Sequence, residues 1–129
     1  MWRYLWAAPC SLIGLLLGCA AWLLRARWRV VQGVIEISLF TRPSRRARPH
    51  RDALPFRAIT LGHVVIGLDA AELNRWRAHE RVHVRQYERW GLLFFAAYPL
   101  ASLWQLLRGR RPYWDNPFEV QARAESARQ

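Results

Sequence analysis

Lysine is absent from this chain of 129 residues, so all 20 basic side chains are arginines. Only nine residues are acidic, and the formal net charge is +11. The exclusive use of arginine indicates an arginine-favouring coding bias as much as a functional requirement. Basic surfaces of this kind suit nucleic acid or an anionic lipid leaflet. The sequence has no nucleic-acid reading motif, no glycine-rich phosphate loop and no internal repeat, so we expect no nucleic-acid partner.

Cysteine is also scarce, with two residues in the whole chain. Cys10 and Cys19 both lie in an apolar segment near the first residue. They form no disulfide framework and lack the spacing of a zinc site. Cysteine usage therefore says nothing about the redox compartment.

A nearly unbroken apolar run extends from Leu5 to Leu24, about 20 residues, which is enough for a helix to cross the hydrocarbon core. Aromatic residues bracket it as they do at membrane interfaces, namely Trp2, Tyr4, Trp6, Trp22 and Trp28. A removable signal peptide is the alternative, because Arg3 precedes the run and Ala20 and Ala21 are small. The run is longer than a usual signal-peptide core, so we expect residues 1–29 to be a retained anchor with a basic flank.

Arginines are more frequent after the apolar run than before it. Arg25, Arg27 and Arg29 follow the run, whereas Arg3 and the amino terminus precede it. The positive-inside rule then places the downstream residues in the cytoplasm. The expected location is a membrane, taken as a bacterial inner membrane, with one span and with residues 30–129 as one domain.

Two β-branched stretches, at 30–40 and 58–67, predict two strands that form a small sheet. In the first stretch, Glu36 and Ser38 are expected on the outer face. The intervening residues 41–56 are rich in arginine and proline and predict a loop. Contact with lipid phosphates and a solvated connector are equally good interpretations of this loop.

No proline or glycine interrupts the run from Asp69 to Trp90, which predicts one long helix that ends at Gly91. Asp69 is the expected N-cap, with Glu72 completing a capping box. Five arginines are expected on the solvated outer face of this helix: Arg75, Arg77, Arg81, Arg85 and Arg89.

The centre of this helix reads His79-Glu80-Arg81-Val82-His83. Residues four apart lie one turn above each other, so the imidazoles of His79 and His83 can bind one small ion. Glu80 lies beside them, close enough to take a proton from a metal-bound water but not placed as a ligand. A catalytic zinc usually takes three ligands from histidine and carboxylate. The stretch therefore predicts a zinc site that lacks one ligand, with two ordinary surface histidines as the alternative.

Through this pentapeptide the chain resembles the zincin class of zinc metallopeptidases. In the gluzincin branch the third ligand is a glutamate on a later helix, and the candidate here is Glu119 in Asn116-Pro117-Phe118-Glu119. The glycine and third histidine of the metzincin branch do not follow His83. The resemblance implies a peptide or protein substrate, bound in extended form by the edge of the strand at 58–67.

Glu119 has a second interpretation as a helix cap. Asn116 at the N-cap, Pro117 at N1 and a glutamate at N3 are together the usual start of a helix. Glu125 and Asp115 are second choices as zinc ligands, and Glu88 is too near in sequence on the helix that carries the histidines.

Two further side chains have alternative roles. His63 either steadies an oxyanion at the site or pairs across its strand. Tyr87, one turn beyond His83, either orients a ligand or polarises a carbonyl, or it packs in the core.

Residues 92–107 are apolar but short, with Pro99 at their middle and arginines on both sides. A second span here would put His83 and Glu119 on opposite sides of the membrane, which excludes one shared zinc. We therefore expect a bent helix, partly core and partly dipping into the leaflet, that enters and leaves on the same side.

The patterns together predict an α+β fold: a transmembrane helix, a two-stranded sheet, the histidine helix, a bent apolar segment and a C-terminal helix. The predicted function is a membrane-anchored zinc metallopeptidase with Glu80 as general base. Its predicted Zn²⁺ ligands are His79, His83 and Glu119. The alternative is a non-catalytic basic membrane protein that binds a protein partner or anionic lipid.

Overall fold

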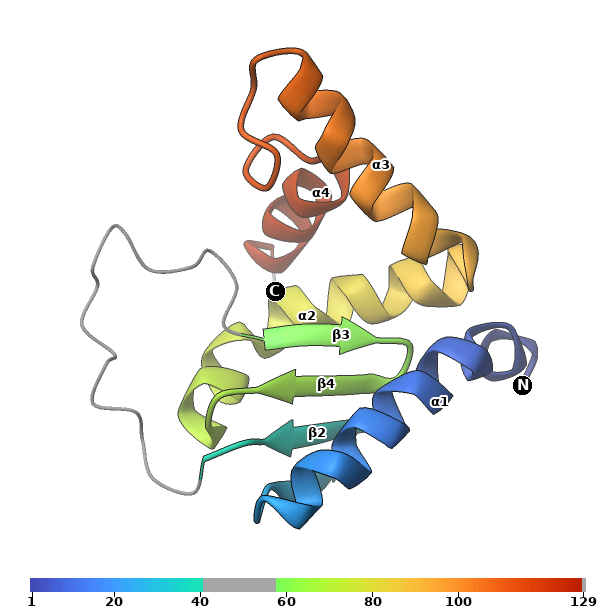
Figure 1. The fold of residues 1–129 in the computed structure, drawn as a ribbon, viewed down its shortest axis with the longest axis vertical. Coiled ribbons are helices and arrows are strands. Elements are labelled where there is room, and N and C mark those ends of the chain that lie inside the picture. Colours follow the sequence, from blue (N-terminus) through green and yellow to red (C-terminus); the bar gives the residue numbers. More distant parts are fainter. Residues whose placement is uncertain (41–57, 129) are drawn as a thin grey trace.

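The fold is α+β in the computed structural model, which describes residues 1–40 and 58–128 (Figure 1). The expected loop at 41–56, with its proposed lipid contact, lies outside the described residues. The described elements are α1 (Trp2–Leu23), β1 (Arg27–Val31), β2 (Val34–Ser38), β3 (Ala58–Leu61), β4 (Val64–Gly67), α2 (Ala70–Trp90), α3 (Leu93–Leu107) and α4 (Pro117–Ser126).

The sheet has four described strands in the order β1-β2-β4-β3, so the expected two-stranded sheet is wrong. The expected strand at 58–67 is the hairpin of β3 and β4. The expected strand at 30–40 contains the end of β1 and all of β2, which form a second hairpin, and β2 and β4 join the two hairpins in parallel. The turns have positive φ angles, 50° at Gln32, 77° at Gly33 and 62° at Gly62. These are the backbone angles that two-residue hairpin turns need. A glutamine at such a position gives no sequence signal, so the first hairpin reads as one strand.

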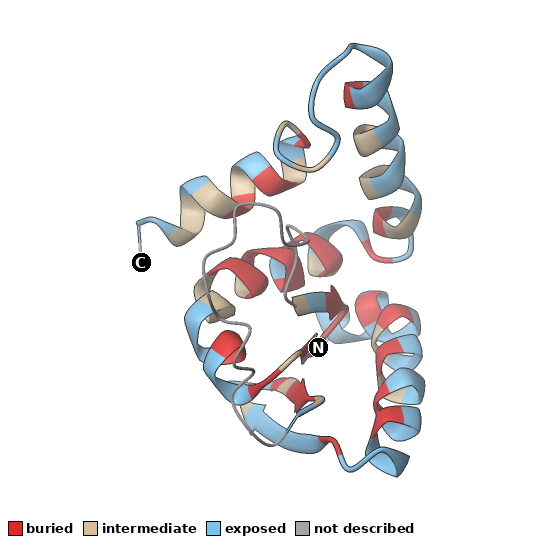
Figure 2. Cartoon of the chain, turned by 60° about the vertical axis from the view of Figure 1, so that its left-hand side comes forward, coloured by how far each residue is buried: buried red, intermediate tan, exposed pale blue. Residues whose placement is uncertain are grey.

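Helices cover both faces of the sheet, α1 on one side and α2 on the other (Figure 1). Ile37 and Val64 pack in a cluster with Ala21 of α1. Val34 and Val65, which point the other way, pack in a cluster with residues of α2. Buried residues are accordingly concentrated in β2, β3, β4 and α2, whereas β1 is mostly exposed (Figure 2). This three-layer packing places one face of α2 against the sheet.

α1 carries a stripe of small buried residues, namely Ala7, Cys10, Gly14, Gly18 and Ala21. These small residues let α1 approach the sheet closely. A Cβ atom added at Gly14 would lie 2.7 Å from Cβ of Val64, which is closer than two carbon atoms can pack. A Cβ at Gly18 would lie 2.3 Å from Cδ1 of Ile37. By length and composition α1 is long and apolar enough to cross a membrane, as the sequence predicts.

Glu36 is buried, with 3% of its surface exposed, and Ser38 is buried too. The expectation that both lie on an outer face of the sheet is therefore wrong. Arg77 donates two hydrogen bonds to the Glu36 carboxylate, at 2.7 and 2.9 Å, and Arg29 donates one at 2.9 Å. Burial raises the pKa of Glu36, but these arginines outweigh it and hold the pKa below its usual range. Arg81 donates to the carbonyl of Val31. Because α2 covers this face, two of its five expected solvated arginines pair with the sheet instead.

The ends of α2 are as the sequence predicts. The side chain of Asp69 accepts a hydrogen bond from the backbone N–H of Glu72 at 2.9 Å. Gly91 ends the helix with a φ of 55°. The chain then turns by 117° into α3, which is a single helix through Pro99. This turn lets the chain fold back, so that α4 packs on α2.

α4 begins at a cap that also ties it to α3. The side chain of Asn116 accepts from the N–H of Phe118 at 3.0 Å, as expected of an N-cap. Its amide nitrogen donates to the carbonyl of Tyr98 at 3.1 Å and to the hydroxyl of Ser102 at 2.8 Å. Asn116 is fully buried. The first turn of α4, which carries Glu119, is thereby fixed against α3.

Candidate metal centre

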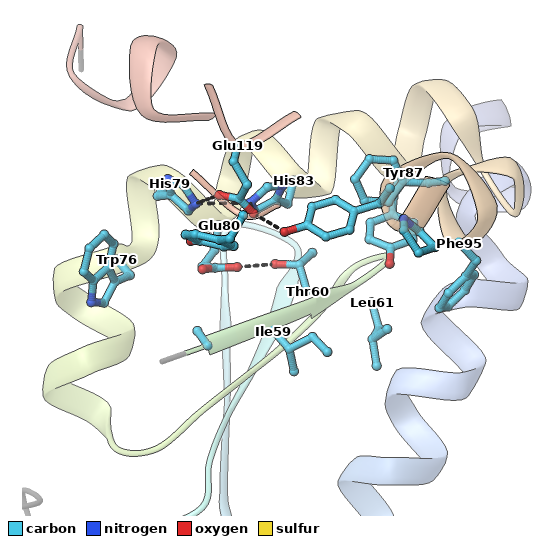
Figure 3. Close-up of a pocket in the computed structure, with 15 residues that line it drawn as sticks. Ile59, Thr60, Leu61, Trp76, His79, Glu80, His83, Tyr87, Phe95 and Glu119 are labelled. Atoms are coloured by element: carbon cyan, nitrogen blue, oxygen red, sulfur yellow. Dashed lines mark hydrogen bonds and ion pairs between the residues drawn. The ribbon is translucent and has the colours of Figure 1, made fainter. Parts of the chain in front are cut away.

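The structure brings His79, His83 and Glu119 together between α2 and α4 (Figure 3). All three are buried, and their possible ligand atoms lie within 4.8 Å of one another. Oε2 of Glu119 is 3.1 Å from Nε2 of His79, and Oε1 is 3.3 Å from Nε2 of His83. The two Nε2 atoms are 3.1 Å apart. Two imidazole nitrogens and both oxygens of one carboxylate, from two helices, therefore lie close together.

These separations fit an ion of the size of zinc. With ligand bonds of about 2.0–2.1 Å and tetrahedral angles, two ligand atoms on one zinc lie about 3.3 Å apart. The two Nε2 atoms, 3.1 Å apart, are close to that value, and each of them lies 3.1 to 3.3 Å from a different oxygen of Glu119. The donor set also fits, since two imidazoles and one carboxylate are a common set of protein ligands in catalytic zinc sites.

Gln86 fixes the orientation of His83. The amide nitrogen of Gln86 donates to the carbonyl of Phe118 at 3.1 Å, so its oxygen is the atom that faces Nδ1 of His83 at 2.8 Å. Nδ1 must then carry the hydrogen, and Nε2 of a neutral ring presents a lone pair to the Glu119 carboxylate. A lone pair and a carboxylate repel each other unless a cation lies between them. The arrangement therefore suits a metal ion, or a proton in its place.

The charge balance of this group agrees with that conclusion. Burial raises the pKa of Glu119, but hydrogen bonds from His79, His83 and Tyr98 outweigh it, and the pKa lies well below its usual range. Glu119 is therefore ionised. Burial lowers the pKa of His83, but Glu119, the charge of Glu80 and the hydrogen bond of Gln86 together raise it. A metal ion or a proton is therefore favoured at Nε2 of His83.

Two tyrosines lie at the Glu119 carboxylate. The hydroxyl of Tyr98 donates to Oε1 of Glu119 at 2.6 Å. Burial raises the pKa of Tyr98, and the hydrogen bond to Glu119 raises it further. Burial and the Glu119 charge likewise raise the pKa of Tyr113. Both hydroxyls therefore remain hydrogen-bond donors at neutral pH.

A cavity of about 340 Å³ opens beside the three residues (Figure 3). Its apolar wall comes from β3 and α3, and includes Ile59, Leu61, Phe94 and Phe95. Glu80 lines the cavity but lies outside the group of three, as expected for a neighbour that is not a ligand. The hydroxyl of Thr60 donates to Oε2 of Glu80 at 2.6 Å. β3 therefore holds the Glu80 carboxylate at the cavity wall.

Glu119 does not act as the reciprocal helix cap. The backbone N–H of Asn116, which a capping glutamate would accept, donates to the carbonyl of Tyr113 at 3.2 Å. The second choices for a ligand have other partners. Glu88 lies 3.1 Å from His63, Glu125 lies 3.1 Å from Arg85, and Asp115 binds Arg111. Among the described acidic residues, Glu119 is the one that joins the two histidines.

His63 and Tyr87 have structural roles. His63 lies in the turn between β3 and β4, pairs with Glu88 and stacks on Tyr4 at 4.4 Å between ring centroids. It does not line the cavity, so it does not face the candidate metal group. Tyr87 packs against Phe94 at 4.5 Å between ring centroids, and the orienting role falls to Gln86.

Thr60, Gln86, Tyr98 and Tyr113 are the site residues that sequence reasoning missed. Gln86 had a usable signal, because it follows His83 by three residues and so lies on the same face of the helix. Tyr98, Ser102 and Gln105 are the polar side chains of a mostly apolar run, and nothing in the sequence singles out Tyr98 among them. Thr60 has no local signal, since its place beside Glu80 depends on how the sheet packs on α2.

Comparison of the chain with protein-family models, curated proteins and solved structures finds no match. The functional argument therefore rests on the geometry of the site.

Proposed function

We propose that this chain is a membrane-associated, zinc-dependent peptidase of gluzincin type. One observation carries the proposal: Nε2 of His79, Nε2 of His83 and the Glu119 carboxylate converge within 4.8 Å, next to a cavity. Glu80 lies on the wall of that cavity. Histidine, histidine and glutamate would hold the metal, and the neighbouring glutamate would handle the proton.

A bound zinc would supply Lewis-acid chemistry, because it lowers the pKa of water and polarises a carbonyl group. The chain itself supplies the proton transfers. Thr60 occupies Oε2 of Glu80, which leaves Oε1 to accept the proton of the attacking water. Glu80 then delivers that proton to the leaving amine, as a general base that becomes the general acid. Tyr98 holds Glu119 in place through its short hydrogen bond.

β3 is an edge strand among the described residues, and this edge supports a peptide substrate. β3 and β4 are joined by a two-residue turn, so Leu61 and Val64 form the hydrogen-bonded pair next to it. Pairs alternate along an antiparallel ladder, so the N–H and C=O of Thr60 point away from β4. Residues Ala58, Ile59, Thr60 and Leu61 line the cavity. An extended peptide added at this edge would pass directly beside Glu80.

A non-catalytic lipid-binding protein is the second candidate. It is favoured by the exposed apolar side chains of α1 and by the net charge of +11. The two candidates differ at Glu80. Lipid binding would survive Glu80→Gln, whereas hydrolysis would fall by about 10²–10⁴-fold, the usual contribution of general acid–base catalysis.

The proposal is tested first by the metal content of detergent-purified protein, measured by elemental mass spectrometry. We expect about one zinc per chain in the wild type and in Glu80→Gln. We expect its loss in His83→Ala and Glu119→Ala, with Glu125→Ala on the same helix as the matched control. Peptide hydrolysis by the wild type and not by Glu80→Gln would then establish the enzyme. A wild-type protein that holds no zinc even after reconstitution with zinc would contradict the proposal.

A further inference from the structure

α1 lies along the sheet rather than projecting from it. Its buried stripe contacts the sheet and the neighbouring helices from Ala7 to Ala21, a distance of about 21 Å at 1.5 Å per residue. Gly14 meets Leu61 and Val64, and Gly18 meets Ile37 and Trp28. Figure 1 shows α1 crossing over β4 and β2. The sheet therefore lies beside α1 and not beyond one of its ends.

This packing conflicts with a helix that crosses the bilayer. If α1 stood across the membrane, the sheet beside it would lie within the hydrocarbon core. β1 is an edge strand of the described sheet, and it carries the exposed Arg27 and Arg29. Open sheet edges do not occur exposed to lipid, because their backbone groups have no hydrogen-bond partners there. Arginines at that depth would add a further cost.

The side of α1 that faces away from the sheet is apolar over its whole length. Leu5 is 69% exposed, Leu16 is 63% exposed and Leu23 is 77% exposed. Further exposed apolar residues on α1 are Leu12, Ile13, Leu17 and Trp22. An exposed apolar face of this length is unusual for a protein in water and indicates an apolar partner.

The charges around this face identify the partner as anionic lipid. Arg3 lies at one end of α1 and Arg25 follows the other end, and both are exposed. Trp2 and Trp22, at the two ends, are 75% and 66% exposed. Arginines and tryptophans at both ends of an apolar face are typical of a helix that lies at a membrane surface.

We propose that α1 lies in the plane of an anionic membrane surface, with its outward face among the acyl chains and the sheet on the aqueous side. The protein is then attached to one leaflet and does not span the membrane. This topology is independent of the metal centre, so it holds or fails whether or not the chain is an enzyme.

The first test compares the two ends of α1 in sealed membrane vesicles from cells that express the full chain. Trp2→Cys and Leu24→Cys are each made in a chain whose native cysteines are replaced by alanine. Ala124→Cys, at an exposed position of α4, marks the side of the domain. We expect a membrane-impermeant maleimide to label all three positions from the same side. Labelling of Trp2→Cys from the side opposite to the other two would overturn the proposal.

The second test measures depth by quenching of a fluorophore with spin-labelled lipids. Native Cys19 is exposed and Cys10 is buried, so Cys19 can be labelled without a substitution on the outward face. A label at Leu12→Cys should lie at the same depth as one at Cys19. A spanning helix would instead separate the two depths by about 10 Å, from seven residues at 1.5 Å each.

The third test adds a charge to the outward face. Leu16→Arg should weaken binding to phosphatidylcholine vesicles that contain phosphatidylglycerol by about tenfold or more. Ala124→Arg, which adds the same charge on α4, should leave binding unchanged. Equal binding of both variants would contradict the proposal, as would a wild type that stays out of the membrane as a soluble dimer.

Discussion

Gln86 joins three parts of the site through one amide group. Its oxygen faces His83, and its nitrogen donates to Phe118 of α4 at 3.1 Å and to Gln121 at 3.0 Å. The residue thus orients a candidate ligand and holds the helix that carries Glu119. Partners of this kind around metal-binding histidines commonly contribute 10–100-fold to affinity.

We therefore expect Gln86→Ala to lower zinc affinity by about 10–100-fold, measured by competition with a chromophoric chelator. Glu125→Gln alters an ion pair with Arg85 that touches no candidate ligand and serves as the control, with affinity close to that of the wild type. Unchanged affinity in Gln86→Ala would show that His83 does not need this partner.

Thr60 offers a test of the role of Glu80. Thr60→Val removes the hydroxyl and keeps the shape, so the Glu80 carboxylate loses the hydrogen bond of 2.6 Å. We expect kcat for peptide hydrolysis to fall by about tenfold, the value of one hydrogen bond to a charged group. Zinc content should not change. Thr60→Ser should restore the rate, and a Thr60→Val enzyme with full activity would remove Thr60 from the mechanism.

At the level of elements, the contact of β2 with α2 depends on the buried Glu36. Glu36→Gln would leave Arg77 and Arg29 without the carboxylate charge, so we expect the free energy of unfolding to fall by about 2 kcal/mol at pH 7. The measurement is urea unfolding in detergent. Glu125→Gln, which alters an exposed pair on α4, is the matched control and should have a much smaller effect.

The pH dependence of that difference follows from the lowered pKa of Glu36. In the unfolded chain a glutamate titrates near about 4.3. The stabilisation is thus fully present above that pH and is lost as the pH falls through the lower pKa of the folded protein. Wild type and Glu36→Gln should converge in stability in acid. A difference that is the same at pH 7 and at acidic pH would mean that packing, and not charge, holds this contact.

The contact of α1 with the sheet depends on Gly18. Gly18→Leu would place atoms where Ile37 and Trp28 already lie, and overpacking of this kind costs about 1–3 kcal/mol. Ala20→Leu adds the same side chain type at an exposed position and should be neutral. Thermal unfolding of the two variants makes the comparison, and equal melting temperatures would contradict the packing described for α1.

Local signals predicted the helices well and the sheet poorly. α2 begins after Asp69 and ends at Gly91, because an N-cap and a glycine with positive φ act within one turn of the chain. The hairpin at Gln32 was missed because its turn depends on the positive φ of a residue that seldom adopts it. Glu36 was misplaced because its burial follows from α2 covering that face, a long-range contact. Likewise the histidine pair is readable from spacing alone, whereas Thr60 is not.

At the scale of the whole molecule, the candidate ligands come from helices that α3 separates in the chain. His83 is on α2 and Glu119 is on α4, so the metal group forms only when the turn at Gly91 brings α4 back. A bound metal would therefore stabilise the docking of α4 on α2, because ligands that bind only the folded state favour it.

We expect metal removal by a chelator to speed hydrogen exchange in α4 more than in α2. α2 also packs on the sheet, whereas α4 packs on α2 and is joined to α3 through hydrogen bonds at Asn116 and Glu119. Hydrogen exchange followed by mass spectrometry compares the metal-loaded and chelated protein, with Glu119→Ala as a variant that should not respond. Equal exchange in α4 with and without metal would show that the two helices stay docked without it.

The order of α1 and its sheet partners along the chain matters during synthesis. α1 is complete at Leu23, but Val64, against which Gly14 packs, is made some 40 residues later. At about 5–20 residues per second, the ribosome needs a few seconds to cover that interval. Throughout it the small-residue face of α1 has no sheet to cover it, and a lipid surface is an apolar phase available to hold the helix. The membrane would then act as a temporary partner for that face, released when β4 emerges and takes its place.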